Sequence, residues 1–204
     1  INCANRFGWD YLIIDADEIS DLNYKKNPLN RCFYCKSKLY DRINAYWDGP
    51  VASGANTDDL GDYRPGLLAA AEKNVLHPFL LAKVSKCEIR QIAKSIGLGD
   101  VAKLPAQPCL ASRVETGIAI RADDLKWINK LEQELERHIG STDIRCRLRH
   151  DGIWMEVRAE VLSSWPKAEQ ILIVEKFRNW CNWWGHPFKG FTTYEMGSAF
   201  LKQS

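Results

Sequence analysis

Residues 50–72 read "PVASGANTDDLGDYRPGLLAAAE", an apolar segment, a polar loop and an alanine-rich segment in direct succession. Residues 50–55 predict a short apolar strand that ends at a glycine, and residues 67–74 predict a helix. Strands that alternate with helices in this way favour a parallel sheet that is covered on both faces. We therefore expect an α/β fold in this part of the chain.

The segments on either side extend this pattern. They predict a strand at residues 11–14, a helix at residues 32–47, and an amphipathic helix at residues 85–97 with Ser85 and Glu88 at capping-box spacing. The two prolines of "LPAQP" at residues 104–108 predict the link out of this region. We expect residues 1–105 to form one domain, a parallel α/β layer without its first strand, because the opening residues read as the end of a helix.

The second half of the chain predicts a different architecture. It contains two long helical patterns, an alternating pair of segments around a turn at Asp151 and Gly152, and a final strand near Phe191. The predicted helices cover residues 122–139 and 167–184. We expect residues 106–204 to form a smaller α+β domain.

The composition excludes a disordered chain. Of the 204 residues, 46% are hydrophobic and 26% are charged, and no apolar run is long enough to span a bilayer. The sequence shows no secretory signal pattern, so we expect a cytoplasmic protein. The net charge of +2 is too small for a broad nucleic-acid-binding surface, so any anion site must be local. The seven cysteines, an odd number without a regular framework, indicate reduced thiols.

The loop that follows the predicted strand at residues 50–55 contains the first candidate site. In a parallel sheet this loop lies at the carboxyl edge, where ligands bind. Asp58 and Asp59 could then hold the Mg²⁺ of a nucleotide, and Arg64 could bind a phosphate or a carboxylate. The alternative is a helix N-terminus at which acidic side chains complement the helix dipole.

Three arginines alternate in "IRCRLRH" at residues 144–150. Because side chains alternate along a strand, Arg145, Arg147 and Arg149 are expected on one face of the strand, about 7 Å apart. Like charges at this spacing repel unless an anion joins them, which favours a phosphate or carboxylate site. The alternative is an exposed edge strand that basic residues protect from aggregation.

Cys32 and Cys35 lie three positions apart at the start of a predicted helix. Such a pair can chelate one ion or exchange as a dithiol. A zinc ribbon needs a second pair, which the sequence lacks, and the bulky Phe33 and Tyr34 between the cysteines are unlike a thioredoxin site. A pair and one remote cysteine can supply the three thiolates of a 4Fe-4S cluster, and Cys109 is the natural third. The alternative for Cys109 is an inert loop thiol.

Four motifs, read together, resemble those of a known family. They are "NRCFYCKSKLY" (30–40), "GANTDDLGDYRPG" (54–66), "PAQPCLASR" (105–113) and "RLRHDG" (147–152). Their order and spacing resemble the ATP-dependent sacrificial sulfur transferases, which act in making the nickel-pincer nucleotide cofactor. The resemblance implies a PP-loop pyrophosphatase fold, with an α/β nucleotide-binding domain followed by a smaller domain. The implied reaction converts a carboxylate of a pyridinium dicarboxylate mononucleotide into a thiocarboxylate through an acyl adenylate.

The resemblance also implies roles for individual residues. Cys109 matches the cysteine that loses its sulfur and becomes dehydroalanine in one branch of the family. In another branch three cysteines hold a 4Fe-4S cluster that carries the sulfur, and the presence of Cys32 and Cys35 resembles that branch. Arg147 and Arg149 match the arginines that bind the substrate phosphate. The residues that match contacts to ATP, its Mg²⁺ or the substrate are Asn56, Asp58, Asp59, Arg64, Ser112, Arg113, Arg147 and Arg149. A homo-oligomer is expected.

The sequence departs from the family at one motif. The S-G-G-x-D-S phosphate loop, whose backbone amides bind pyrophosphate, does not occur in these residues. We therefore expect a fragment or a shortened reading frame that begins after this loop. Two other functions stay open: a tRNA thiolase, which would need a broad basic surface, and a remnant that binds a nucleotide or a metal without turnover. An in-frame S-G-G-x-D-S stretch upstream of Ile1 would favour the sulfur transferase.

Overall fold

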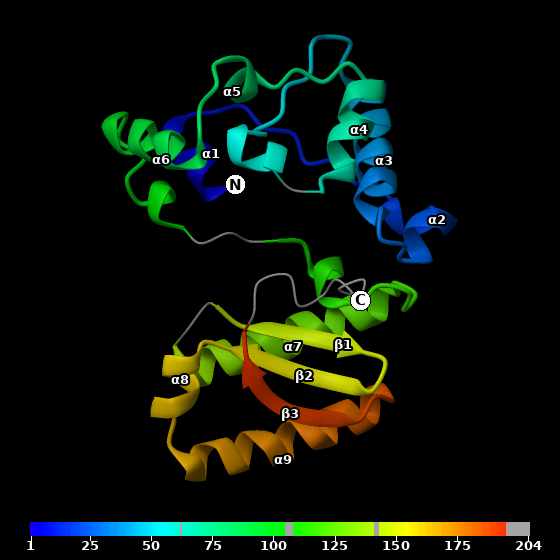
Figure 1. Ribbon diagram of the computed structural model, residues 1–204, viewed down its shortest axis with the longest axis vertical. Helices are drawn as coiled ribbons and strands as arrows, with labels where there is room; N and C mark the ends of the chain where they lie inside the picture. The colour runs from blue at the N-terminus through cyan, green and yellow to red at the C-terminus, as the bar shows by residue number, and fades with distance from the viewer. Residues whose placement is uncertain (62, 105–107, 141–142, 195–204) are drawn as a thin grey trace. The chain divides into compact units, whose positions relative to one another are not determined.

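The computed structural model describes residues 1–61, 63–104, 108–140 and 143–194, which divide into two compact units (Figure 1). The helical unit comprises Ile1–Asp21 and Asn30–Ile89. The sheet unit comprises Leu22–Leu29 and the chain from Arg90 onward. The expected domain boundary at residues 105 and 106 falls outside the described residues and stays a prediction.

The helical unit consists of helices and turns joined by loops. Its elements are α1 (Asn2–Phe7), η1 (Glu18–Ser20), α3 (Arg31–Tyr46), η2 (Thr57–Gly61), α4 (Pro65–Glu72), α5 (Pro78–Leu81) and the first part of α6 (Lys86–Ser95). The predicted helix at residues 32–47 and the alanine-rich helix are confirmed as α3 and α4. The capping box at α6 is also confirmed, because the Ser85 amide donates to Glu88 Oε2 (2.8 Å) and the Glu88 amide donates to Ser85 Oγ (3.3 Å).

We expected a parallel sheet in this unit. Its described residues instead form a single parallel β-bridge. Ala52 and Leu76 form this parallel bridge, in which the Leu76 amide donates to the Val51 carbonyl (2.8 Å). Residues 11–14, expected as a buried strand, have no strand structure, and Leu12 and Ile13 are 70% and 71% exposed. An apolar run becomes a strand only when a neighbouring backbone pairs with it, and the described part of this unit provides none for residues 11–14.

The sheet unit combines helices with a three-stranded mixed sheet. Its elements are α2 (Leu22–Lys25), η3 (Val101–Lys103), η4 (Leu110–Arg113), α7 (Ala122–Ile139), β1 (Arg145–Arg149), β2 (Gly152–Val157), α8 (Ala159–Ser164), α9 (Lys167–Trp184) and β3 (Phe188–Thr193). The predicted helices, the hairpin and the last strand are confirmed. β1 and β2 are antiparallel, whereas β3 lies parallel to β2, so the order is β1-β2-β3. The chain as a whole is an α/β protein.

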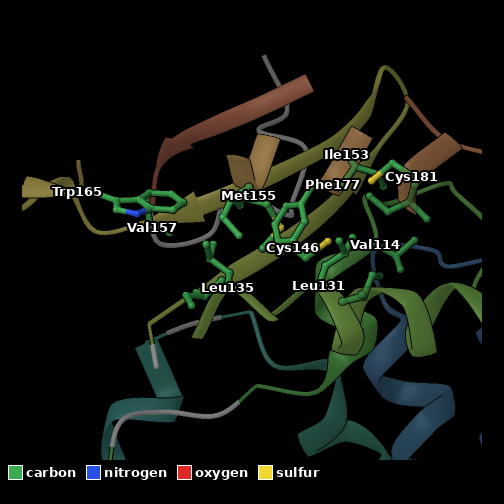
Figure 2. Close-up of a cluster of buried hydrophobic side chains, with 14 residues drawn as sticks. Val114, Leu131, Leu135, Cys146, Ile153, Met155, Val157, Trp165, Phe177 and Cys181 are labelled. Atoms are coloured by element: carbon green, nitrogen blue, oxygen red, sulfur yellow. The ribbon is translucent and has the colours of Figure 1, made fainter. Parts of the chain in front are cut away.

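A continuous apolar core fills the sheet unit (Figure 2). Cys146 from β1, Met155 from β2 and Leu131 from α7 are fully buried and pack with Phe177 and Cys181 from α9. The inward faces of β1 and β2 and one stripe each of α7 and α9 therefore supply most of the buried core. Among the described residues, no helix is both long enough and apolar enough to cross a membrane.

A short segment from early in the chain belongs to the sheet unit. The buried Asn27 amide group donates to the carbonyl oxygens of Val114 (3.3 Å), Glu115 (2.8 Å) and Ile118 (2.9 Å). The Ile120 amide in turn donates to the Lys25 carbonyl oxygen (2.8 Å). These bonds satisfy backbone groups of the segment before α7, so the α2 region stabilises the sheet unit.

Candidate functional site

The candidate nucleotide loop of the helical unit forms a local hydrogen-bonded network. The buried Asn56 donates through its side-chain amide to Asp59 Oδ2 (3.1 Å), and its backbone amide donates to the same oxygen (3.0 Å). Arg64 pairs with Asp59 Oδ1 (3.1 Å). The structure therefore brings together Asn56, Asp59 and Arg64, and Asp59 is the carboxylate that organises the loop.

Asp58 faces a different partner. Its Oδ2 accepts a hydrogen bond from the Lys86 amide at the first turn of α6 (3.1 Å), and its own amide donates to Asn56 Oδ1 (3.1 Å). This is the contact expected of an acid at a helix N-terminus, where the free amides and the helix dipole favour negative charge. The carboxylates of the neighbouring aspartates thus have separate partners in the structure.

Cys32 and Cys35 are both half-buried in the first turns of α3. The start of α4 packs closely here, since a Cβ atom at Gly66 would lie 3.1 Å from Lys36 Cγ and 3.7 Å from the Cys32 carbonyl oxygen. Arg64 is the N-cap residue of α4. The structure therefore places the cysteine pair and the Arg64 end of the candidate nucleotide loop side by side within the helical unit.

Cys109 is exposed and directly precedes η4 in the sheet unit. Its carbonyl oxygen accepts hydrogen bonds from the Ser112 hydroxyl (2.7 Å) and the Ser112 amide (3.0 Å). Ser112, expected among the residues that contact ATP or the substrate, closes the turn that carries Cys109. The exposed thiol is chemically accessible, which a sulfur donor or a cluster ligand requires.

Arg113 is buried beneath this turn. Its Nε and Nη2 atoms donate to the two carboxylate oxygens of Glu132 (2.9 and 3.1 Å), and its Nη1 donates to the Pro108 carbonyl oxygen (2.8 Å). A paired, buried guanidinium of this kind stabilises the local backbone. Arg113 contacts the protein through each of its three nitrogen atoms.

Arg147 and Arg149 share one buried carboxylate. Glu156, 1% exposed, accepts from Arg147 Nε (2.8 Å) and Arg149 Nη2 (2.7 Å). Arg147 is itself buried and also donates to the Ser112 carbonyl oxygen (2.9 Å). The Arg149 side chain is 30% exposed, so it is the more accessible of these two cations. The predicted common face of the arginines is confirmed, since Cys146 and Leu148 between them point into the core.

Burial changes the proton affinity of two other β1 side chains. Desolvation lowers the pKa of Arg145, and the nearby positive charge of Arg113 lowers it further. The pKa of the Cys146 thiol is well above its usual value, mainly because the thiol is desolvated. Cys146 is therefore an inert core thiol, unlike the exposed Cys109.

The three candidate cluster ligands are divided between the units. Cys32 and Cys35 belong to the helical unit and Cys109 to the sheet unit, so their convergence stays a prediction. Within the described residues, no group of three or more His, Cys, Asp or Glu side chains is arranged to hold a metal ion. The cysteine pair at the start of α3 nevertheless supplies two thiolates of the type that bind iron or zinc.

Comparison with known proteins relates the chain to three proteins. It is 34% identical over 181 residues to the uncharacterized protein slr1717 of Synechocystis, across 86% of this chain and 67% of that protein. The chain belongs to the slr1717 family. A second relative, the uncharacterized protein MJ0830 of Methanocaldococcus jannaschii, is 29% identical across 87% of this chain and 68% of its own length. No family model matches the chain.

The name of the third relative states the chemistry of its product. The pyridinium-3,5-bisthiocarboxylic acid mononucleotide synthase of Lactiplantibacillus plantarum is 30% identical over 155 residues. The match covers 74% of this chain and 55% of the synthase, so the chain spans little more than half the length of that protein. The chain is a distant homologue of this synthase.

Two carboxylates of this family member were missed by sequence reasoning. Glu132 follows Ile128 by four residues and so lies on the apolar stripe of α7, where a carboxylate signals a buried partner. Glu156 is aligned with Arg145 across the hairpin, on the same face as the arginines. The register around the Asp151 turn could have identified it.

Proposed function

We propose that this chain is part of an ATP-dependent sulfur transferase that converts carboxylates of a pyridinium dicarboxylate mononucleotide into thiocarboxylates for nickel-pincer cofactor biosynthesis. The homologous synthase carries a bisthiocarboxylic acid mononucleotide in its name, which supports this substrate class. The observation that carries the proposal is the exposed Cys109 thiol on a turn fixed by buried ion pairs. A sulfur donor must be both accessible and held in place.

The proposed reaction has two chemical stages. A substrate carboxylate oxygen attacks the α-phosphorus of ATP, pyrophosphate leaves, and an acyl adenylate forms. Cys109 Sγ then loses its proton and bonds to the acyl carbon, and AMP leaves with the electron pair of the broken C–O bond. Removal of the Cys109 Cα proton breaks the Cβ–S bond, its electron pair passes to sulfur, and the products are a thiocarboxylate and dehydroalanine. These reaction steps need no external oxidant or reductant.

The chain's other candidate residues would neutralise phosphate charge. In this proposal Asn56, Asp59 and Arg64 contact ATP, and Asp58 and Asp59 supply carboxylate oxygens to Mg²⁺. Arg149 binds the substrate phosphate through its exposed edge. Such contacts matter because adenylation concentrates negative charge at the reacting phosphate.

Cys32 and Cys35 give the proposal a second form. Together with Cys109 they would hold a 4Fe-4S cluster, which would supply the transferred sulfur when bound. The donor set fits this group, because two half-buried thiols lie one helical turn apart and the third is exposed. In this form Cys109 is a ligand and retains its own sulfur.

The proposal is tested with the complete gene product, ATP, Mg²⁺ and the pyridinium dicarboxylate mononucleotide. We expect substrate-dependent exchange of labelled pyrophosphate into ATP and a thiocarboxylate product. Anaerobic reconstitution with iron and sulfide separates the two forms, since only the cluster form gives visible absorption that disappears in Cys32→Ala. A protein that binds ATP without exchange or product would instead be a binding remnant, and the sulfur transferase proposal would be wrong.

A further inference from the structure

Two buried arginines donate to the main chain of residues 108–113, which we call the Cys109 turn. Arg113 Nη1 donates to the carbonyl oxygens of Pro108 (2.8 Å) and Cys109 (3.3 Å). Arg147 Nη1 donates to the Ser112 carbonyl oxygen (2.9 Å). Both ends of the turn are therefore held by guanidinium groups whose side chains are only 6% exposed.

Each of these guanidinium groups is fixed by a different carboxylate. Glu132 accepts from Arg113 in a bidentate manner, and its Oε1 also accepts from the Cys146 amide of β1 (2.8 Å). Glu156 of β2 accepts from Arg147 Nε (2.8 Å). The planar fork of Arg113 has a defined orientation because two of its donors pair with Glu132, so its remaining donor points in a defined direction. Arg147 is oriented by its single bond to Glu156 together with its bond to the Ser112 carbonyl oxygen.

The hydrogen bonds of the turn leave the sulfur at the surface. The Arg113 and Ser112 side chains both donate to the Cys109 carbonyl oxygen, while the Cys109 side chain is exposed. The backbone that carries the nucleophile is thus fixed by contacts on its buried side. Burial of two arginines with their carboxylates is costly, and the cost is offset only because every group has a close partner.

We propose that Arg113 with Glu132, and Arg147 with Glu156, are positioning residues that hold the Cys109 turn in one conformation and aim its sulfur at the activated acyl carbon. This inference rests on the proposed function. It gives Arg147 a different role from the phosphate contact that the sequence resemblance implies, and gives Arg113 a role other than a direct ligand contact. Arg149 remains the more accessible cation. Misplacement of a reacting atom by about 1 Å lowers a rate by about a hundredfold, so the arrangement has a direct chemical benefit.

The first test measures the turn itself by amide hydrogen exchange. In Arg113→Lys and Arg147→Lys the charge is kept but the fork is lost, so the Ser112 and Val114 amides, both bonded inside the turn, should exchange about tenfold faster. Amides of the β1–β2 pair should be unchanged. Arg137→Lys is the matched control, because Arg137 is exposed and pairs with Glu134 on α7. Unchanged exchange at Ser112 and Val114 would overturn the proposal.

The second test measures sulfur transfer in a single turnover. In the complete gene product, Arg113→Lys should lower the rate constant of thiocarboxylate formation at least about tenfold, while the KM for ATP stays the same. An unchanged rate constant in an active enzyme would overturn the positioning role. If the wild type shows no transfer, the proposed function fails and the exchange experiment alone decides whether the arginines order the turn.

If Arg113→Lys destabilises the whole fold, a milder substitution tests the same contact. Should Arg113→Lys raise exchange throughout the β1–β2 pair, Glu132→Gln replaces it, because glutamine keeps the side-chain shape and one acceptor oxygen. Faster exchange confined to the Cys109 turn in Glu132→Gln would support the proposal. Exchange in the turn equal to that of the wild type would refute it.

Discussion

The sheet unit and the helical unit bury apolar side chains to different extents. The sheet unit has a continuous core that includes Phe177, Leu131 and Met155, all fully buried (Figure 2). In the described part of the helical unit, a smaller buried hydrophobic cluster consists of Tyr40, Ala70 and Val75. Because burial of apolar area is the main source of stability, the sheet unit should be the more stable of the two.

The same contrast applies to the candidate site residues. In the sheet unit the ion pairs that hold the Cys109 turn are buried, as shown by Arg113 and Arg147. In the helical unit Arg64, which pairs with Asp59, has a side chain that is 52% exposed. Buried pairs depend on precise geometry, whereas exposed pairs contribute little and rearrange readily. Under the proposed function, the sheet unit would fix the nucleophile and the helical unit would adjust around a ligand.

The largest expected effect is the loss of the central aromatic side chain of the sheet unit. Phe177 is fully buried and contacts the rings of Trp180, Phe188 and Phe191. Phe177→Ala should lower the free energy of unfolding by about 4 kcal/mol. Chemical denaturation followed by tryptophan fluorescence measures this change. Leu172→Ala, on the exposed side of the same helix, is the control and should change stability by less than about 0.5 kcal/mol.

The next effect concerns Glu156, the buried carboxylate on the face of β1 and β2 that carries the arginines. Glu156→Gln removes the negative charge that pairs Arg147 and Arg149, so it should lower the free energy of unfolding by about 3 kcal/mol. Urea titration of the variant beside Glu160→Gln, an exposed residue of α8, gives the comparison. A loss below about 0.5 kcal/mol would show that the arginines find other partners and that the face is not rigid.

A smaller effect is expected in the core of the helical unit. Val75→Ala removes two methyl groups from the Tyr40, Ala70 and Val75 cluster and should cost about 1.5 kcal/mol. A weakly packed unit opens locally, and this opening exposes its amides to exchange. Hydrogen exchange of the α3 and α4 amides therefore measures the change in stability. The contrast between the units would disappear if Val75→Ala destabilised the protein as much as Phe177→Ala.

The smallest effect is a pH dependence of the sheet unit. A hydrogen bond from Lys176 is the main cause that holds the pKa of the nearly buried Glu134 below its usual value. A carboxyl group with a lowered folded-state pKa stabilises the fold above its unfolded value of about 4.5, and this stability is lost as the pH falls through the folded-state pKa. Thermal melts between about pH 6 and pH 3 should therefore show a weaker acid dependence in Glu134→Gln than in the wild type. Equal slopes would exclude this linkage.

Local signals in the sequence predicted most of the helices. α7 and α9 end where Gly140 and Gly185 adopt left-handed conformations (φ 63° and 91°), and the periodic patterns before them specify the buried stripe. The alternation of Arg145, Arg147 and Arg149 likewise predicted which face of β1 they share. These features depend on residues that are close in sequence.

Features that depend on distant residues were not predictable in the same way. Residues 11–14 have the composition of a buried strand, yet strand formation requires a pairing backbone that composition does not specify. The carbonyl contacts of Asn27 span more than 80 residues of sequence, as the separations of 87 and 88 positions show. Arg113 was expected at a ligand, and only the fold shows that Glu132 holds it beneath the Cys109 turn.

The most direct test of the account is peptide mass spectrometry of the cysteines after a single turnover, combined with activity of Cys109→Ala. If Cys109 donates its own sulfur, its peptide alone should contain dehydroalanine in proportion to the thiocarboxylate formed. Cys146 and Cys181 are internal controls, because burial raises the pKa of Cys181 to about 12 and that of Cys146 well above its usual value. If a cluster supplies the sulfur, Cys109 should remain intact and Cys109→Ala should be inactive. Thiocarboxylate formation by Cys109→Ala at the wild-type rate would contradict both forms and remove Cys109 from the reaction.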